Sequence, residues 1–247
     1  MSEQQNIDDI LRNWEFDPES VTVRMCEGED GRELIQMRVD MGVLQIETAN
    51  RPDGLKPHGK DTYLNHLAQS ESEDPDFEMD EQHCSEADRE FVQFYHRRIC
   101  WLALKEYPRA VRDADHTLGL MDFCTNHSSD EEWTTTFEQY RPFVLFHRTQ
   151  AASLACLENE LDAEAAIEEL NKGLDQMHRI FIRYEAEHLF DEDELVVRLS
   201  EFREMLRDEY DVGKTLQEKL SEAIAKEEYE LAAQLRDELA NRNRTSS

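Results

Sequence analysis

Helix-forming residues dominate the chain from about residue 86 to its end, and this feature most limits what the protein can fold into. Only three of the eight glycines lie beyond residue 86, and apolar side chains recur there at the three- and four-residue spacing of an amphipathic helix. A break at Tyr107-Pro108 starts a new helix, because proline fits the first turn, where no backbone donor is lost. We therefore expect a series of helices, one of them capped by Asp162 and another following Asp191.

Strand-like patterns are confined to the first fifty residues. Apolar and polar side chains alternate there with the two-residue period of a strand that buries one face. The three runs are 21–25, 35–39 and 44–46. Asp30-Gly31 and Met41-Gly42 lie between them and predict turns. We expect an antiparallel three-strand meander that packs on helices, because three short strands cannot bury a core alone. A short amphipathic helix, from Ile7 to Trp14, is expected before it.

The expected fold class is mainly α with a small N-terminal antiparallel β-meander, that is, α+β. Residues 71–81 carry seven acids and no base, so mutual repulsion and Pro75 favour a linker or an exposed loop. The EF-hand pattern for calcium fails in this segment because its turn glycine is missing. The expected divisions are a β-containing unit at 1–68, an acidic linker at 69–85, a helical body at 86–211 and a helical hairpin at 214–241.

The charge balance limits the classes of partner. The chain has 57 acidic and 27 basic residues, for a net charge of −30, and such a field repels the phosphate backbone of nucleic acids. No apolar run approaches the roughly 20 residues that cross a bilayer, and the polar, acidic N-terminus does not resemble a secretory signal. The five cysteines form no CxxC pair, so reduced thiols fit better than disulfides or a zinc site. We expect a cytoplasmic protein without metal or cofactor, whose body does not bind nucleic acid directly.

Two segments of the helical body resemble degenerate tetratricopeptide repeats. The first places aromatic and small residues where that repeat has them, at Trp101, Tyr107, Ala110 and Ala114. The second, AAIEELNKGL at 165–174, is similar to the second-helix signature, with Ala166 and Gly173 at its small positions. Arg98 departs from the pattern because a small residue is expected there, and the two units are offset by about 56 residues rather than about 34. The resemblance implies a repeat-like body, and an ordinary antiparallel helical bundle is the alternative.

Residues 214–241, KTLQEKLSEAIAKEEYELAAQLRDELAN, form the most informative segment. Two apolar stripes at helical spacing flank Lys226-Glu227-Glu228, and each helix has only about three turns, so the two must pack on each other or on a partner. The adjacent Ala232 and Ala233 predict a close approach of the two helices. The two stripes and the residues beside them include Leu216, Leu220, Ala223, Ile224, Tyr229, Ala232, Ala233, Leu235, Arg236, Asp237 and Leu239.

This segment resembles the UVR motif, whose core is an aromatic residue and an acid followed by A-A-x-[LI]-R-D. Here the core runs from Tyr229 to Asp237, and the resemblance covers about 30 of the 247 residues. It implies a binding module, with the eleven residues named above as the expected binding residues. In the excision-repair subunits UvrB and UvrC the motif mediates their association, and it also occurs in Clp-type chaperone ATPases and in an activator of protein arginine kinase. Residues 214–247 carry a net charge of −1, so this part can approach acidic partners better than the rest, which carries −29.

Three functions are compatible with these patterns. The first is a non-catalytic adaptor or scaffold that binds a protein through the hairpin, with a UvrB/UvrC-type protein, a Clp-type protein or a second copy of the chain as the partner. The second is an accessory factor of nucleotide excision repair. The third is an enzyme with an unfamiliar site near the N-terminal sheet and the Arg51 to Gly59 loop. We favour the adaptor, because no nucleophile elbow, dinucleotide fingerprint or catalytic triad pattern is present.

A possible phosphate-binding loop at Gly213-Lys214-Thr215 is rejected. The P-loop needs a glycine where Asp208 stands and a buried strand before the loop, whereas the pattern before Gly213 predicts a helix. The segment is therefore interpreted as a junction between helices.

Overall fold

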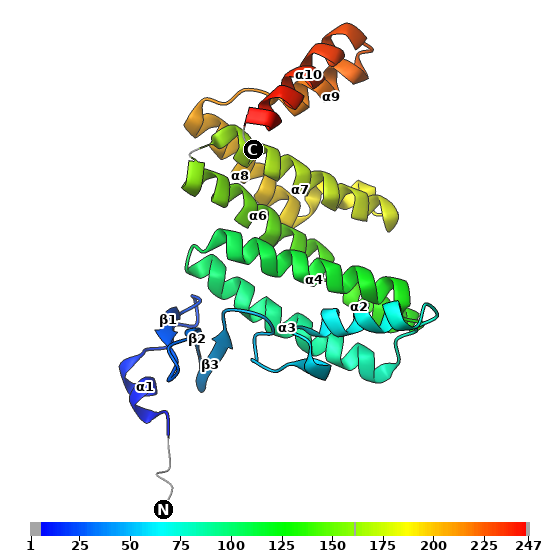
Figure 1. The fold of residues 1–247 in the computed structure, drawn as a ribbon. Helices are drawn as coiled ribbons and strands as arrows, with labels where there is room; N and C mark the ends of the chain where they lie inside the picture. The colour runs from blue at the N-terminus through cyan, green and yellow to red at the C-terminus, as the bar shows by residue number, and fades with distance from the viewer. Residues whose placement is uncertain (1–5, 161, 246–247) are drawn as a thin grey trace, which may run out of the picture. The chain divides into compact units, whose positions relative to one another are not determined.

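The computed structural model describes the backbone of residues 6–160 and 162–245. It is mainly helical with a small N-terminal sheet, which confirms the expected α+β class (Figure 1). The chain forms two compact units, residues 1–151 and 152–247. This boundary lies inside a helix of the expected helical body, at a place where the sequence predicted no division. None of the helices among the described residues has the length and apolar character needed to cross a membrane.

The first unit begins with a helix and three strands. Their bounds are α1 (Asp8–Asn13), β1 (Val23–Glu27), β2 (Glu33–Val39) and β3 (Gly42–Glu47). The strands pair in the order β1-β2-β3, antiparallel throughout, so the expected meander is confirmed. Gly31 adopts the left-handed φ of 82° in the first turn, which glycine accommodates without strain. Met25 on β1, one of the two edge strands, is exposed, contrary to the expected buried face.

Helices complete the first unit and bury the sheet. They are η1 (Pro57–Gly59), α2 (Tyr63–Glu73), α3 (Glu81–Ala103), α4 (Tyr107–His127), α5 (Glu131–Glu138) and the first half of α6 (Arg141–Glu160). Ile35 of β2 and Ile46 of β3 share one core cluster with Trp101 of α3 and Ala110 of α4. The sheet therefore packs on helices, as three short strands require.

The acidic segment is not the linker that its charge predicted. Residues 69–73 belong to α2 and residues 81–85 to α3, and all of them lie within one compact unit. Between these helices Met79 is buried, and its amide donates to the carbonyl of His127 at 2.8 Å. Asp80 then caps α3 by accepting from the amide of His83 at 2.9 Å. Apolar anchoring and helix capping therefore order a segment in which like charges alone would favour an open loop.

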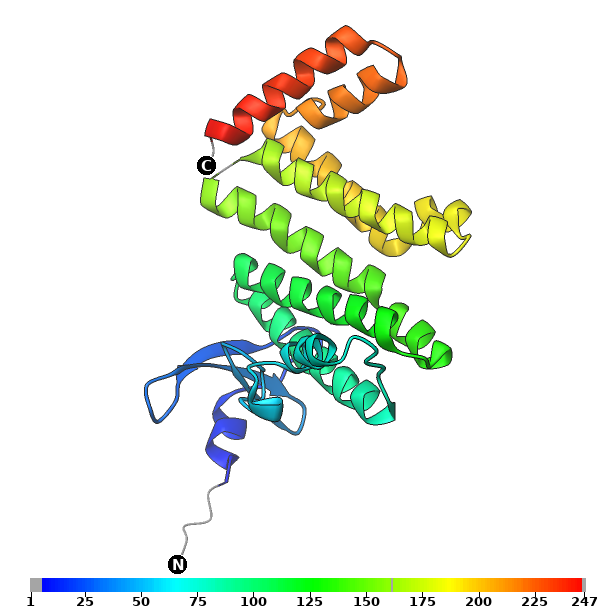
Figure 2. The same cartoon turned by 45° about the vertical axis from the view of Figure 1, so that its right-hand side comes forward.

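The second unit contains the end of α6 and the remaining helices. These are α7 (Ala163–Arg183), η2 (Glu187–Glu192), α8 (Glu194–Tyr210), α9 (Leu216–Ala225) and α10 (Tyr229–Thr245). Asp162 caps α7 as predicted, since its carboxylate accepts from the amide of Ala165 at 2.9 Å. The cap of α8 is Asp193, because η2 occupies the residues around Asp191. Helices α9 and α10 lie side by side as a hairpin in both views (Figures 1 and 2).

Candidate functional site

The C-terminal hairpin begins at Thr215, a fully buried residue. Its hydroxyl accepts from the amide of Glu218 at 3.3 Å, and the Glu218 carboxylate accepts from the amide of Thr215 at 2.8 Å. This reciprocal capping box fixes the first turn of α9. Residues 213–215 therefore form a helix junction preceded by α8, as expected, rather than a phosphate loop preceded by a strand.

Contacts to the preceding helices anchor the same end of the hairpin, which we call its root (residues 213–218). Arg207 of α8 donates to the carbonyl of Gly213 at 2.9 Å and forms a salt bridge with Glu218. The amide of Leu216 donates to the carboxylate of Glu164 in α7 at 3.4 Å. The Arg207 guanidinium and the amide of Thr215 contribute to holding the pKa of Glu218 below its usual value, although burial opposes this. The root is thus attached by charged hydrogen bonds to two helices of the same unit.

Three buried side chains form the seam between the two hairpin helices. Ala223 of α9 packs with Ala232 and Leu235 of α10, and Leu216 and Leu220 cover this cluster while partly buried themselves. The small side chains at 223 and 232 allow the two backbones to approach closely. The seam is short, so the hairpin has little apolar burial of its own with which to remain folded.

Two sequence predictions about this seam are wrong. Ala233 is exposed rather than placed where the helices meet, and Ile224 is 55% exposed rather than part of the buried stripe. Each helical residue is rotated by about 100° from its neighbour, so adjacent positions cannot both face one partner helix. On α10 the stripe that faces α9 contains Ala232, Leu235 and the partly buried Leu239.

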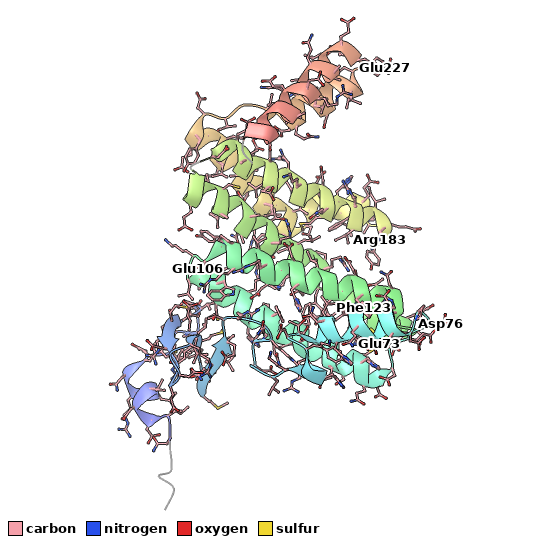
Figure 3. All side chains as sticks on the ribbon, in the orientation of Figure 1. Glu73, Asp76, Glu106, Phe123, Arg183 and Glu227 are labelled. Carbon is pink, nitrogen blue, oxygen red and sulfur yellow. The ribbon has the colours of Figure 1, made fainter. Side chains whose placement is uncertain are left out.

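The turn of the hairpin, which we call its tip (residues 224–231), is closed by a left-handed glutamate. Glu227 has a φ of 58°. Its amide donates to the carbonyl of Ile224 at 3.0 Å, and the amide of Glu228 donates to the carbonyl of Ala223 at 2.8 Å. These are the bonds of a Schellman C-cap, in which glycine is preferred at the left-handed position. Glu227 is labelled at this turn, at the opposite end of α9 from the root (Figure 3).

Glu227→Gly is expected to stabilise the hairpin by about 1 kcal/mol, because a side chain in the left-handed region is strained and glycine is not. Native-state hydrogen exchange of the amides in α9 and α10 measures this change. The matched control is Glu228→Gly, which removes the same charge at the next position, where φ is not positive. This control should leave the protection of the amides unchanged or lower it. Equal protection of the two variants would contradict the assigned strain.

Three large apolar side chains are exposed around the tip. Ile224 is 55% exposed, Tyr229 is 68% exposed and Leu231 is 43% exposed. Tyr229, Ala233 and Arg236 are spaced by four and three residues, so they form one stripe beside the seam. Because the helices run antiparallel, helical rotation places Ile224 on the same side of the seam. We call this surface, made of Ile224, Tyr229, Ala233 and Arg236, the tip face.

The charged residues of the expected motif core lie on the surface of the hairpin. Arg236 donates to Asp237 at 3.3 Å, and both side chains are about 70% exposed. Of the expected binding residues, five are therefore exposed: Ile224, Tyr229, Ala233, Arg236 and Asp237. Only exposed side chains are available to a partner without unfolding of the hairpin. The buried members, Ala223, Ala232 and Leu235, hold the two helices together instead.

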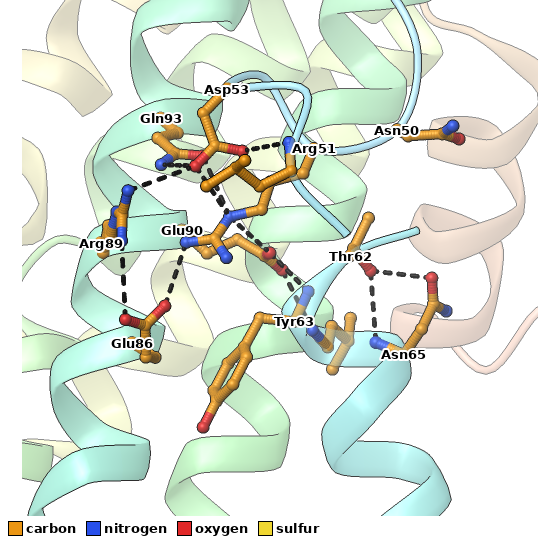
Figure 4. Close-up of polar contacts among 12 residues, drawn as sticks. Asn50, Arg51, Asp53, Thr62, Tyr63, Asn65, Glu86, Arg89, Glu90 and Gln93 are labelled. Atoms are coloured by element: carbon orange, nitrogen blue, oxygen red, sulfur yellow. Dashed lines mark hydrogen bonds and ion pairs between the residues drawn. The ribbon is translucent and has the colours of Figure 1, made fainter. Parts of the chain in front are cut away.

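The loop after the sheet, considered above as an alternative site, holds a buried network of charges (Figure 4). Arg51 is 2% exposed and donates to Glu86 of α3 at 3.2 Å and to Gln93 at 3.2 Å. Glu90, with no exposed surface, lies 3.7 Å from Arg51 and accepts from the first two amides of α2. The network attaches the loop and the start of α2 to α3. Its hydrogen-bonding groups are directed at one another, an arrangement that serves structure.

A short helical hairpin with an anchored root and exposed apolar side chains at its tip has the form of an element that can present one face to a protein partner. Residues 214–241 match the family model described as "UvrB/uvrC motif", a motif known from protein–protein and DNA-repair interactions. The match confirms the resemblance drawn from the sequence, with the same bounds. No curated protein and no solved structure matches the chain.

Several residues that position the hairpin were missed from the sequence. Arg207 and Glu164 lie outside the motif, and nothing local to them indicates contact with it. The capping box of Thr215 and Glu218 carries a recognisable pattern, a threonine followed three residues later by a glutamate, and could have been found. Leu231 was omitted because it lies outside both apolar stripes, and that position is what leaves it exposed.

Proposed function

We propose that the protein is a non-catalytic adaptor that associates with another protein through the tip face of its C-terminal hairpin. The observation that carries this proposal is the exposure of Ile224 and Tyr229 at one end of a hairpin whose other end is anchored. Exposed apolar side chains gathered on one small surface mark interaction sites more often than scattered ones do. Tyrosine is also among the residues that contribute most to the free energy of protein association.

The motif favours a partner that carries the same kind of hairpin. A UvrB/UvrC-type subunit is the first such candidate, and the protein would then act as an accessory factor of excision repair. A Clp-type protein or a second copy of the chain could bind the same tip face. The acidic body supports the adaptor role over direct action on DNA, because the net charge of −30 repels phosphate.

Replacing both tip residues, as Ile224→Ser with Tyr229→Ala, is expected to weaken partner binding about tenfold or more while the protein stays folded. The experiment is capture of partners by the intact chain, identification of the bound protein, and a binding isotherm for each variant with that protein. Analytical ultracentrifugation of the chain alone tests self-association.

The chain offers a matched control in the same unit. Ile182 and Tyr184 are 49% and 51% exposed at the end of α7, so Ile182→Ser with Tyr184→Ala removes the same atoms from another surface. This control should bind as the parent does. Parental affinity of the tip variant for every captured partner would refute the docking role. A captured protein outside excision repair that depends on the tip would refute the repair role alone.

A further inference from the structure

The first unit contains an aromatic pocket that has no part in the hairpin. It has a volume of about 750 Å³ and lies among α3, α5 and the start of α6. Its walls come mainly from six aromatic side chains: Phe91, Tyr95, Trp133, Phe137, Tyr140 and Phe143. Pockets of 300–1,000 Å³ with mainly apolar walls and few polar groups are typical of small-molecule sites.

The aromatic walls hold one another in place. Trp133 stacks on Phe137 with ring centroids 5.0 Å apart, and Phe91 meets the same Phe137 edge-on at 5.1 Å. Tyr140 lies 5.6 Å from Phe91. Such contacts stabilise each ring in its position.

Among the described residues that line the pocket, Asp88 is the one acidic residue, and none is a lysine or an arginine. Its carboxylate accepts from the indole Nε1 of Trp133 at 3.0 Å. Partial burial raises the pKa of Asp88 and the hydrogen bond from Trp133 lowers it, while the residue keeps contact with solvent. Burial also lowers the pKa of His96, the other titratable wall residue besides the tyrosines, so its imidazole is neutral at pH 7. The pocket therefore presents a negative charge without a positive one.

We propose that this pocket binds a small organic cation, a molecule with an apolar body and one alkylated or protonated amine. Aromatic walls attract cations through the negative faces of their rings, and they bury the apolar body at the same time. Asp88 supplies the counter-charge that the wall otherwise lacks. Glu131 and Glu132, exposed in the first turn of α5, add further negative charge close to Trp133.

The volume favours a free molecule over a single side chain of a partner protein. A cavity of about 750 Å³ is several times larger than one lysine or arginine side chain and matches the range for drug-sized ligands. An anion is disfavoured, because the wall offers it a carboxylate and no positive side chain. A neutral apolar molecule would leave Asp88 without a counter-charge.

Isothermal titration calorimetry with benzyltrimethylammonium tests the proposal on the full chain, with 3-phenylpropan-1-ol as the neutral probe and 3-phenylpropanoate as the anionic one. We expect the cation to bind about tenfold or more tightly than the neutral probe, and the anion least tightly. Asp88→Asn keeps an acceptor for Trp133 and removes the charge, so it should reduce the preference for the cation to the part that the aromatic rings supply, while leaving neutral-probe binding unchanged. The control is Asp40→Asn, an exposed site that does not line the pocket.

Three results would overturn the proposal. The first is equal binding of the three probes, or no binding at millimolar concentration. The second is a preference for the cation that is undiminished in Asp88→Asn. The third is binding of a trimethyl-lysine peptide at this pocket without binding of the free cation, which would assign it to a partner protein instead. None of these depends on the hairpin, so failure here leaves the docking role intact.

Discussion

Ala232→Asp is expected to unfold the C-terminal hairpin, whereas Ala233→Asp leaves it folded. Ala232 is 8% exposed within the seam, so an aspartate there loses its hydration without gaining a partner, which costs on the order of several kcal/mol. Three buried side chains cannot offset that loss. Ala233 is exposed, and its aspartate stays in water. The two variants differ by one position and carry the same charge, so each is the control for the other.

Hydrogen exchange of the amides in α9 and α10 measures this difference. Protection should be lost in Ala232→Asp and retained in Ala233→Asp, while the amides of the first unit keep their protection in both. Partner binding, measured beside hydrogen exchange, distinguishes loss of the fold from loss of the binding surface. It should fall in Ala232→Asp through unfolding and in Ala233→Asp through the charge that this variant adds to the tip face. Equal protection of the two variants would show that the seam has been assigned to the wrong stripe.

Glu90→Ala is expected to destabilise the first unit by about 4 kcal/mol. Glu90 has no exposed surface, and its carboxylate accepts from the amides of Tyr63 and Leu64 at 2.5 and 3.0 Å. It also bonds His116 at 2.9 Å and lies 3.7 Å from Arg51. Its removal leaves two helix-start amides and a buried guanidinium without this acceptor, and burial makes each loss costly.

The matched control is Glu86→Ala, one turn earlier on the same face of α3. Glu86 is 33% exposed and its ion pairs are with Arg51 and Arg89, so its loss should cost about 1 kcal/mol or less. Urea unfolding of the two variants, followed by the fluorescence of the three tryptophans, Trp14, Trp101 and Trp133, gives both changes in the free energy of unfolding. Similar values for Glu90→Ala and Glu86→Ala would mean that the network stabilises the fold far less than its burial implies.

The sequence was sufficient for features that depend on neighbouring residues. Alternation of apolar and polar residues predicted the meander, Asp162 predicted a cap, and Pro108 predicted the start of α4. The motif at 214–241 likewise depends on a local pattern. Periodicity could also have separated Ala232 from Ala233, because the seam repeats every three or four residues and adjacent positions cannot share it.

Features that bring together residues far apart in the chain could not be predicted from the sequence. Arg98 breaks the repeat pattern on α3, yet the structure buries it, and it donates to Thr117 at 3.1 Å and to His147 at 3.3 Å, while its Nη2 has no partner among the described residues. Burial and the guanidinium of Arg98 lower the pKa of His147 to about 4, so its neutral ring can accept this bond. These partners lie on α4 and α6, and the aromatic pocket draws on three helices. Residue spacing along the chain therefore predicts neither the hydrogen bonds of Arg98 nor the pocket.

The anchored root has a consequence for the geometry of any complex. A module joined by a flexible tether samples many directions, and its partner with it, so that only the tether length limits their separation. Here the salt bridge of Arg207 with Glu218 and the hydrogen bond from Leu216 to Glu164 attach the first turn of α9 to α8 and α7. A protein bound at the tip would therefore be restricted in its orientation to the rest of the second unit, at about 15 Å along α9 from the root. The hairpin would then limit the directions in which a bound protein can lie, which a flexible tether does not.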